Sequence, residues 1–247
     1  MSFSLDPGLL ALWIAVGIVG GSIAYRAADA LLERGAGLPG LSTRCPRCGA
    51  PLGPLVTIAT LAALFRARCA GCGWWPERAQ FAAELLMGAL FAIVSLRGGD
   101  ATARLTDALA LLVLLAATLT DLRERLVPDL LTYPAILLWA ALSFLPGGVA
   151  PESALVGALA GGGTMLAIYA LGRALYRRDV FGFGDVKLAL FVGIAVGWPR
   201  VLGALIGAAF SGGLIAVLLL FAGRGRAGTM PYGPAIALGA AIQLVGP

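Results

Sequence analysis

Long apolar runs alternate with short polar segments along most of the chain. A helix needs about 20 residues to cross about 30 Å of hydrocarbon. Eight runs approach this length, at residues 9–27, 80–97, 104–122, 130–147, 153–174, 180–198, 200–222 and 229–246. The pattern therefore predicts an all-α polytopic membrane protein with about eight transmembrane helices.

Two segments depart from this simple pattern. The apolar stretch at residues 55–65 has only 11 residues, so we expect it to be interfacial or buried rather than a crossing. In the sixth run, the apolar residues that follow Asp185 are too few to cross the hydrocarbon by themselves. We therefore expect that helix to begin before Gly182, with Asp185 inside it near one end.

Composition supports the membrane assignment. Hydrophobic residues make up 60% of the chain, charged residues only 13%, and the mean hydropathy is +0.92. A water-soluble domain needs far more polar surface. Residues 1–8 carry Asp6 and no basic residue, so we expect a retained first span, not a cleaved signal peptide. The net charge of +5 suits membrane lipids, and we expect no nucleic-acid partner.

The basic residues predict an orientation. Of the 18 Lys and Arg residues, Arg97, Arg104 and Arg200 fall on one side of the eight-span scheme and the other 15 on the opposite side. The positive-inside rule then places the basic loops in the cytoplasm and both termini in the periplasm. This gives a first transmembrane helix at 1–30, a cytoplasmic cysteine-rich loop at 31–79 and a seven-helix membrane domain at 80–247.

Small residues favour close helix packing in two of the predicted spans. Gly17, Gly20 and Gly21 lie in the first span and Gly161, Gly162 and Gly163 in the fifth. Glycine lets the backbones of two membrane helices approach closely. We assign these glycines to packing and not to chemistry.

The four cysteines form two C-x-x-C pairs, Cys45/Cys48 and Cys69/Cys72, each followed by glycine. This spacing is typical of a closed, tetrahedral structural zinc site. A reducing cytoplasm argues against disulfides. An iron–sulfur cluster, or a single iron held by the same thiolates, stays open as an alternative.

The chain has no histidine, which excludes a His-ligated catalytic zinc and a Ser-His-Asp triad. Carboxylates are then the leading candidates for acid–base work. Asp121 ends an apolar run, near the predicted inner edge of the hydrocarbon. The alternative is that Asp121 and Asp129 merely flank a solvated loop, with Asp121 pairing Arg125 one helical turn away. Asp129, beyond Pro128, should be the more solvated of the two.

A second candidate site is the sequence Gly182-Phe183-Gly184-Asp185-Val186-Lys187. The two glycines remove side chains where a helix or an extended peptide could approach the backbone. Lys187 is the sole lysine of the chain, and an interfacial anchor is the simpler explanation for it.

The alternating scheme brings Asp121 and Asp185 to the same face of the membrane. Two carboxyl groups that face each other in a low-dielectric pocket cannot both ionise cheaply, so they share a proton. One can then activate water while the other protonates the carbonyl oxygen or the leaving amine. The composition therefore leaves a two-aspartate hydrolase open.

The ordered set of motifs resembles the type IV prepilin leader peptidases, which are GxGD-type membrane aspartyl proteases. Residues 182–187 resemble the G-x-G-D-x-K of that family, residues 121–129 its first aspartate segment, and residues 231–235 its P-[FY]-G-P element. The cysteine loop, Glu84 after it and Gly21-Ser22 before it also lie where the family has them.

This resemblance implies that Asp121 and Asp185 are the catalytic pair, with Gly182, Gly184 and Lys187 supporting the site. It implies cleavage of the short basic leader of a prepilin or pseudopilin on the cytoplasmic side of the bacterial inner membrane, in a pilus or type II secretion pathway. Many members also methylate the new N-terminus with S-adenosylmethionine. Residues 21–26 lack the asparagine of many relatives, so the sequence supports proteolysis more strongly than methyl transfer.

Two other classes of function fit parts of the pattern. An ion- or proton-coupled transporter could use the same acidic residues, but such proteins often show repeated halves and mid-membrane acids, and neither is evident here. A non-catalytic scaffold organised by the cysteine loop is the third alternative.

Overall fold

The computed structural model describes residues 6–32, 44–97, 100–176, 182–221 and 231–246. Within these ranges the regular structure is helical, and the only β-type pairing is an isolated bridge between Arg44 and Pro51. The all-α prediction is confirmed. The chain divides into two compact units, Met1–Gly98 and Gly99–Pro247.

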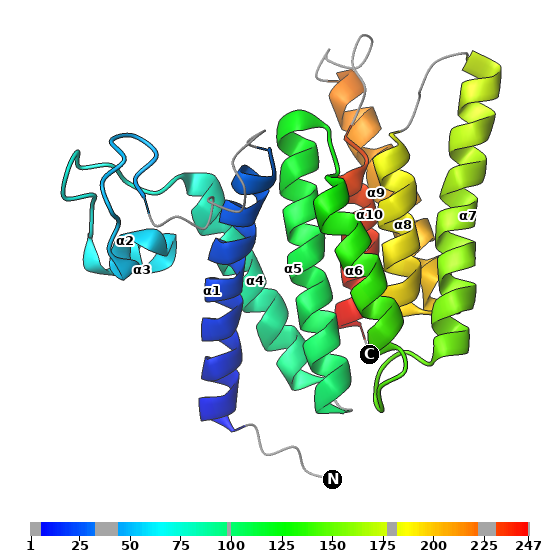
Figure 1. Ribbon diagram of the computed structural model, residues 1–247, viewed down its shortest axis with the longest axis horizontal. Coiled ribbons are helices and arrows are strands. Elements are labelled where there is room, and N and C mark those ends of the chain that lie inside the picture. The colour runs from blue at the N-terminus through cyan, green and yellow to red at the C-terminus, as the bar shows by residue number, and fades with distance from the viewer. Residues whose placement is uncertain (1–5, 33–43, 98–99, 177–181, 222–230, 247) are drawn as a thin grey trace. The chain divides into compact units, whose positions relative to one another are not determined.

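The described residues of the first unit form four helices and those of the second unit form six (Figure 1). Their bounds are α1 (Pro7–Leu32), α2 (Pro54–Thr57), α3 (Ala59–Phe65), α4 (Arg78–Leu96), α5 (Ala101–Glu124), α6 (Asp129–Leu142), α7 (Pro151–Tyr176), α8 (Phe183–Val196), α9 (Arg200–Phe221) and α10 (Gly233–Val245).

Each of the eight predicted spans coincides with one of the longer helices. Five of them, α1, α4, α5, α7 and α9, are long and apolar enough to cross a membrane. The other three, α6, α8 and α10, have 14, 14 and 13 residues. At 1.5 Å per residue a 14-residue helix extends only about 21 Å, which is less than the hydrocarbon thickness.

Some parts of the sequence predictions lie outside the described residues. These are residues 1–5, most of the first half of the cysteine loop, and the outermost residues of the predicted spans at 180–198, 200–222 and 229–246. Five of the arginines in the charge count, Arg34, Arg177, Arg178, Arg224 and Arg226, lie there too.

In the first unit, α1 and α4 cross at very short range. A Cβ atom on Gly17 would lie 2.6 Å from the carbonyl oxygen of Met87, and one on Gly21 would lie 2.8 Å from that of Ala83. Trp13 packs its ring against Phe91 further along the same crossing, with 6.0 Å between centroids. These two glycines pack as the sequence predicted.

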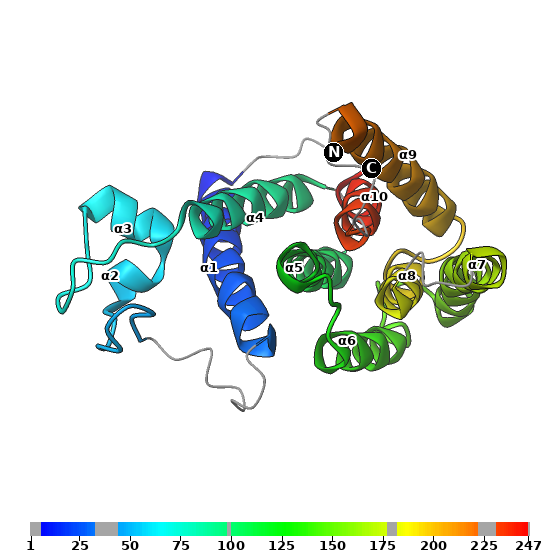
Figure 2. The ribbon, with the colours of Figure 1, turned by 90° about the horizontal axis from the view of Figure 1, so that it is seen from above.

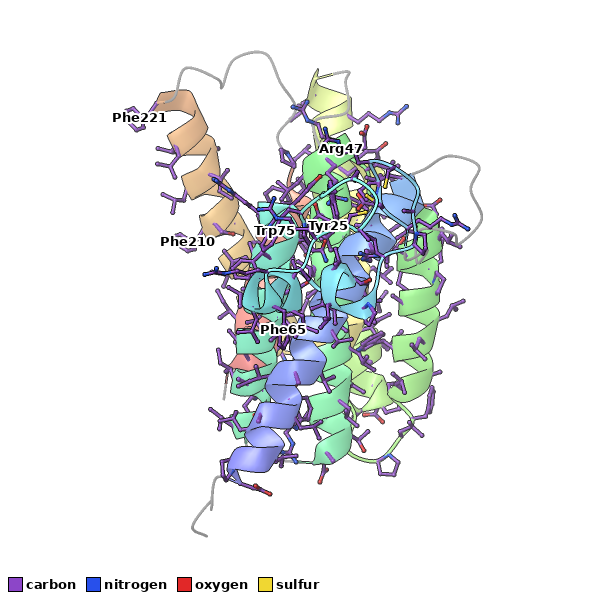
Figure 3. The ribbon with its side chains drawn as sticks, turned by 90° about the vertical axis from the view of Figure 1, so that its left-hand side faces the viewer. Tyr25, Arg47, Phe65, Trp75, Phe210 and Phe221 are labelled. Carbon is purple, nitrogen blue, oxygen red and sulfur yellow. The ribbon has the colours of Figure 1, made fainter. Side chains whose placement is uncertain are left out.

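In the second unit, α8 is the central helix. It packs against α5, α6, α7, α9 and α10, and Figure 2 shows this arrangement end-on. Ten of its 14 residues are buried. By contrast α9 carries exposed apolar side chains such as Phe210 and Phe221, which project outward in Figure 3. Apolar side chains that face outward from a membrane helix are suited to lipid.

Glycines also bring α7 close to α8. Gly157 and Gly193 face each other so closely that neither could carry a Cβ, and a Cβ on Gly161 would lie 2.5 Å from the Ala189 carbonyl oxygen. A Cβ on Gly162 would crowd Leu190, but one on Gly163 would meet open space. Close packing by the fifth-span glycines is therefore confirmed at two of the three positions.

The expected start of α8 is wrong. The helix begins at Phe183, after Gly182 rather than before it. Gly182 is its N-cap in extended conformation, and Asp185 lies in its first turn. Glycine is a poor helix former, whereas an acidic residue in the first turn is favoured by the helix dipole. This local chemistry outweighs the length of the apolar run.

Candidate functional site

Asp121 lies in the last turns of α5, where the helix stops at Arg125 in the left-handed conformation (φ 54°). The Arg125 N–H donates to the Asp121 carbonyl oxygen at 2.9 Å and closes the final turn. The Asp121 side chain is only 5% exposed, and Thr120 beside it is fully buried. Asp121 is therefore buried at the end of α5 and is not part of a solvated loop.

The Asp121 carboxylate is held by a residue far away in the sequence. The backbone N–H of Gly233, the first residue of α10, donates to Asp121 Oδ2 at 2.8 Å. A Cβ on Gly233 would lie 2.7 Å from that same oxygen, so a side chain at this position would displace the Asp121 carboxylate. The sequence singled out residues 231–235 as a motif but gave Gly233 no role in the site.

Asp185 is buried in the first turn of α8, at 7% exposure. Its Oδ2 accepts a hydrogen bond from the Gly182 N–H at 3.2 Å, and its own N–H donates to the Gly182 carbonyl at 3.0 Å. The charges of Asp185 and Asp121 interact, and that of Asp185 also acts on Tyr232, just before α10. The start of α8 carries Asp185 and the start of α10 binds Asp121. The two carboxyl groups are therefore close enough for their charges to interact.

The two glycines before Asp185 differ in their surroundings. A Cβ on Gly184 would lie 3.0 Å from the Cβ of Val127, in the turn between α5 and α6. A Cβ on Gly182 would meet nothing closer than 3.7 Å. The close approach predicted at these glycines therefore occurs at Gly184, where the partner is the protein's own turn, and Gly182 is left exposed beside Asp185.

Lys187 joins α8 to the start of α6. Its ammonium group contacts the Asp129 carboxylate and lies 5.3 Å from the centre of the Tyr133 ring. The Lys187 side chain is 11% exposed and that of Asp129 is 66% exposed. Asp129 is thus the solvated aspartate, as expected, whereas Lys187 lies against protein instead of extending into solvent as a simple anchor would.

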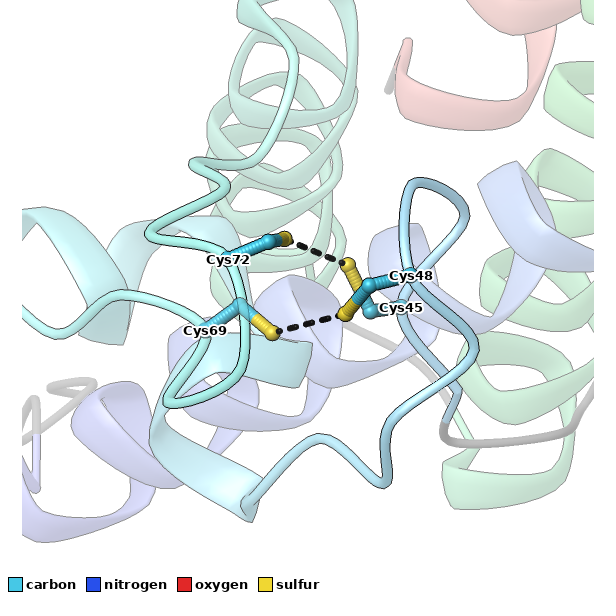
Figure 4. Close-up of side chains that lie close together, drawn as sticks. All are labelled: Cys45, Cys48, Cys69 and Cys72. Carbon is cyan, nitrogen blue, oxygen red and sulfur yellow. Dashed lines mark hydrogen bonds between the residues drawn. The ribbon is translucent and has the colours of Figure 1, made fainter.

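The four predicted cysteine ligands converge in the first unit (Figure 4). Their sulfur atoms all lie within 4.8 Å of one another, and all four cysteines are free thiols. Two contacts join the knuckles, with 3.6 Å between the sulfur atoms of Cys45 and Cys72 and 3.6 Å between those of Cys48 and Cys69. The cysteines are therefore positioned to bind a metal ion.

The two knuckles share the same backbone design. In each, the glycine after the second cysteine has positive φ, 72° at Gly49 and 68° at Gly73, and its N–H donates to the carbonyl oxygen of the first cysteine. Non-glycine residues rarely adopt this conformation. The tight turn directs both thiols of a pair to the same side.

The donor set fits a tetrahedral metal ion. Metal–sulfur bonds of about 2.3 Å in a tetrahedron place the sulfur atoms about 3.8 Å apart. This is close to the 3.6 Å that separates Cys45 from Cys72 and Cys48 from Cys69. Burial opposes ionisation of the Cys45 thiol, but backbone N–H groups and neighbouring thiols donate to its sulfur and lower its pKa to about 7. Burial raises the pKa of the neighbouring Cys72 thiol to about 12, so the four thiols do not ionise equally on their own. A bound cation would favour the thiolate form of all four.

Comparison with known proteins identifies the family. The model of the type IV leader peptidase family matches residues 108–217. The "Prepilin leader peptidase/N-methyltransferase" of Aeromonas salmonicida is 34% identical over 209 residues, covering 81% of this chain and 70% of the relative. Proteins of the same name are 36% identical in Myxococcus xanthus (75% of this chain, 56% of the relative) and 31% identical in Neisseria gonorrhoeae (78% and 66%). This chain belongs to the type IV leader peptidase family.

The extent of the family match separates the two sites. Residues 108–217 include Asp121, Asp185 and the glycines before Asp185, but none of the four cysteines. No solved structure matches the chain. Membership of a leader peptidase family agrees with the hydrolase that the sequence suggested and favours it over an ion-coupled transporter.

Proposed function

We propose that this protein is a prepilin peptidase that cleaves the basic leader from type IV prepilins or pseudopilins, with Asp121 and Asp185 as its catalytic pair. The observation that carries the proposal is the burial of both carboxyl groups in a member of this family, that of Asp121 against the start of α10 and that of Asp185 in the first turn of α8. Burying an acidic side chain in or near a membrane costs free energy, so acids that are buried there usually have a function.

The hydrogen bonds suggest how the pair works. Backbone N–H groups of Gly233 and Gly182 reach Oδ2 of Asp121 and of Asp185 respectively. We assign Oδ1 of each carboxyl group to the reaction. One carboxylate takes a proton from water as the water oxygen attacks the scissile carbonyl carbon, and the other carboxyl group protonates the carbonyl oxygen. The tetrahedral intermediate collapses when the leaving nitrogen is protonated and the C–N bond breaks.

Three groups support the pair in this proposal. Gly184 lets the turn at Val127 approach α8, Gly182 leaves space beside Asp185, and Lys187 ties α8 to α6 through Asp129. None of these residues needs to touch the reacting atoms. Their role is to hold the two carboxyl groups in register.

We propose that Cys45, Cys48, Cys69 and Cys72 bind a structural zinc ion. A closed set of four thiolates leaves no open position for substrate, so the metal would stabilise the loop and take no part in hydrolysis. Iron held by the same thiolates is the alternative, and metal analysis separates the two.

Methylation of the new N-terminus is a second activity suggested by the names of the relatives. The polar positions that the family resemblance selects in the first unit, Ser22 and Glu84, are both engaged in hydrogen bonds within the fold. We therefore assign no described residue to S-adenosylmethionine. Mass analysis of the cleaved product in its presence tests this activity.

We propose the bacterial inner membrane as the location, with the aspartates and the cysteine loop toward the cytoplasm and both termini in the periplasm. The proposed parts are a first span at 1–30, the cysteine loop at 31–79 and the membrane domain at 80–247. Expected partners are prepilin or pseudopilin leaders, membrane lipids, and a pilus or type II secretion apparatus.

The deciding experiment incubates the purified full-length protein with a prepilin peptide, beside an Asp185→Ala variant. Cleavage by the wild type alone supports the peptidase. Ion flux into vesicles without cleavage would indicate the transporter, and the absence of both activities would indicate a scaffold.

A further inference from the structure

The short helices α2 and α3 carry apolar side chains that the protein does not cover. Leu55 is 44% exposed, Leu64 72% and Phe65 59%. All three lie in the loop between α1 and α4, outside the long spans. Contact of a transmembrane helix with lipid therefore does not explain their exposure. This surface needs a partner.

A buried hydrogen-bond cluster fixes the position of α3 along α4. Glu84 is fully buried in α4, and its carboxylate accepts hydrogen bonds from the Ala59 and Thr60 N–H groups at 2.8 and 2.7 Å. These are the first two residues of α3, so Glu84 caps that helix. Gln80, one turn earlier in α4, donates to the Thr57 carbonyl at 2.8 Å.

The same cluster fixes α2 against α1. The Thr57 carbonyl also accepts hydrogen bonds from Ser22 Oγ and from the Arg26 guanidinium, each at 3.2 Å. Ser22 and Arg26 both lie within α1, several residues before its end at Leu32. The segment is thus attached to the sides of both helices rather than beyond their ends.

The length of α4 indicates how deep the start of α3 lies in the membrane. This helix has 19 residues, or about 28 Å, so nearly all of it is needed to cross the hydrocarbon. Glu84 lies six residues from its start at Arg78, which places the beginning of α3 about 9 Å inside that end. Figure 3 agrees, since Phe65 lies level with the middle of α1 and well below Arg47.

Basic residues flank the apolar ones. Arg66 and Arg68 follow α3, Arg78 begins α4, and all three are exposed. Arg68 lies 5.7 Å from the centre of the ring of Trp75, which is 41% exposed. Exposed arginine and tryptophan beside apolar side chains match a lipid headgroup boundary, where long basic side chains extend toward the anionic groups.

We propose that α2 and α3 form an interfacial anchor seated in the leaflet on the side of the cysteine loop. Leu55, Leu64 and Phe65 lie among the acyl chains, and Arg66, Arg68 and Arg78 bind anionic headgroups. Val56, in α2, packs in the same small core as Cys45 and Cys69. The anchor therefore holds the metal centre at the membrane surface, and this conclusion does not depend on the proposed peptidase activity.

The test measures depth in the intact protein. An environment-sensitive fluorescent amino acid replaces Phe65, and separate proteins carry it at Leu86, on the exposed side of α4, or at Arg47 in the first knuckle. Each protein is reconstituted in vesicles of phosphatidylcholine and phosphatidylglycerol whose acyl chains carry bromine either near the headgroup or near the bilayer centre. Bromine quenches a fluorophore only at short range.

We expect acyl-chain bromine to quench the probes at positions 65 and 86 and not the probe at 47. Omitting phosphatidylglycerol should reduce quenching at 65 and leave 86 unchanged. A probe at 65 that behaves like the one at 47 overturns the anchor, and quenching at 65 that ignores the lipid charge overturns the role of the arginines.

A second measurement needs no substitution. Photoactivatable acyl chains in the same vesicles should crosslink the unmodified protein within residues 54–66, as found by peptide mass spectrometry. Crosslinks confined to the long helices, with none in this segment, would overturn the proposal even if a labelled protein failed to fold.

Discussion

The aspartate site and the cysteine site are built on opposite plans. Asp121, Asp185 and Gly233 come from three helices, and the hydrogen bond between Asp121 and Gly233 joins residues 112 positions apart. The cysteine site comes from two local turns, and each turn sets the direction of its own pair of thiols. Helix packing assembles the first site, whereas short-range backbone geometry positions the four thiols of the second.

The two sites should therefore be disturbed by different changes. A change in helix contacts should disturb the aspartates and leave the cysteines intact, because the two sites lie in different compact units. Removal of a metal ion from the cysteines should disturb the cysteine loop and leave the aspartates intact. Substitutions at the two sites should therefore affect cleavage and metal binding separately.

Asparagine in place of Asp121 or Asp185 should lower cleavage by about 10³-fold or more, because a pair that shares a proton fails as a unit when either acid is removed. The measurement is the rate of leader removal by purified variants at matched amounts. Asp129→Asn is the control, since that side chain is solvated and should retain substantial activity. An inactive Asp129→Asn beside an active Asp121→Asn would show that the wrong first aspartate was chosen.

Valine in place of Gly184 should lower cleavage by about 10²-fold, because its side chain collides with Val127 and shifts the start of α8 by a fraction of an ångström or more. The protein should still fold. Gly213→Val on α9 is the matched control, since a Cβ there meets nothing within 4 Å. Full activity of Gly184→Val would contradict a role for this contact.

Features that depend on neighbouring residues in the chain could be predicted from the sequence. Contacts between residues far apart in the chain could not. Runs of apolar residues located all eight long helices, and the C-x-x-C spacing located the metal ligands, because both depend on neighbours in the chain. The start of α8 was missed because apolar length was weighed above the glycines that precede Asp185. The contacts of Gly233 with Asp121 and of Lys187 with Asp129 depend on helix packing, which no periodicity encodes.

Methionine in place of Lys187 should lower cleavage by about fivefold or less, because an ion pair with one largely exposed partner contributes at most about 1 kcal/mol. A double-mutant cycle with Asp129→Ala checks whether the two residues act together. If they do, the double variant is no slower than Lys187→Met. Independent, multiplying losses would mean that Lys187 acts by some contact other than Asp129.

Serine in place of Cys45 and Cys48 should change cleavage by less than about twofold, because the cysteines belong to a different compact unit from the two aspartates. It should nevertheless abolish metal binding and loosen the cysteine loop, while the membrane helices still insert. Elemental analysis and limited proteolysis measure these effects. A wild-type protein purified without chelators and found to hold neither zinc nor iron would contradict the metal site.

The two-aspartate mechanism requires that Asp121 and Asp185 together bind the tetrahedral intermediate of water attack. It is tested most directly with a leader peptide whose scissile bond is replaced by an uncleavable, hydroxyl-bearing tetrahedral group. The wild type and Asp129→Asn should bind this analogue at least about 10²-fold more tightly than the matching substrate, as expected for a transition-state mimic. Asp121→Asn and Asp185→Asn should lose that advantage. Equal affinity for the analogue in all four proteins would contradict the two-aspartate mechanism.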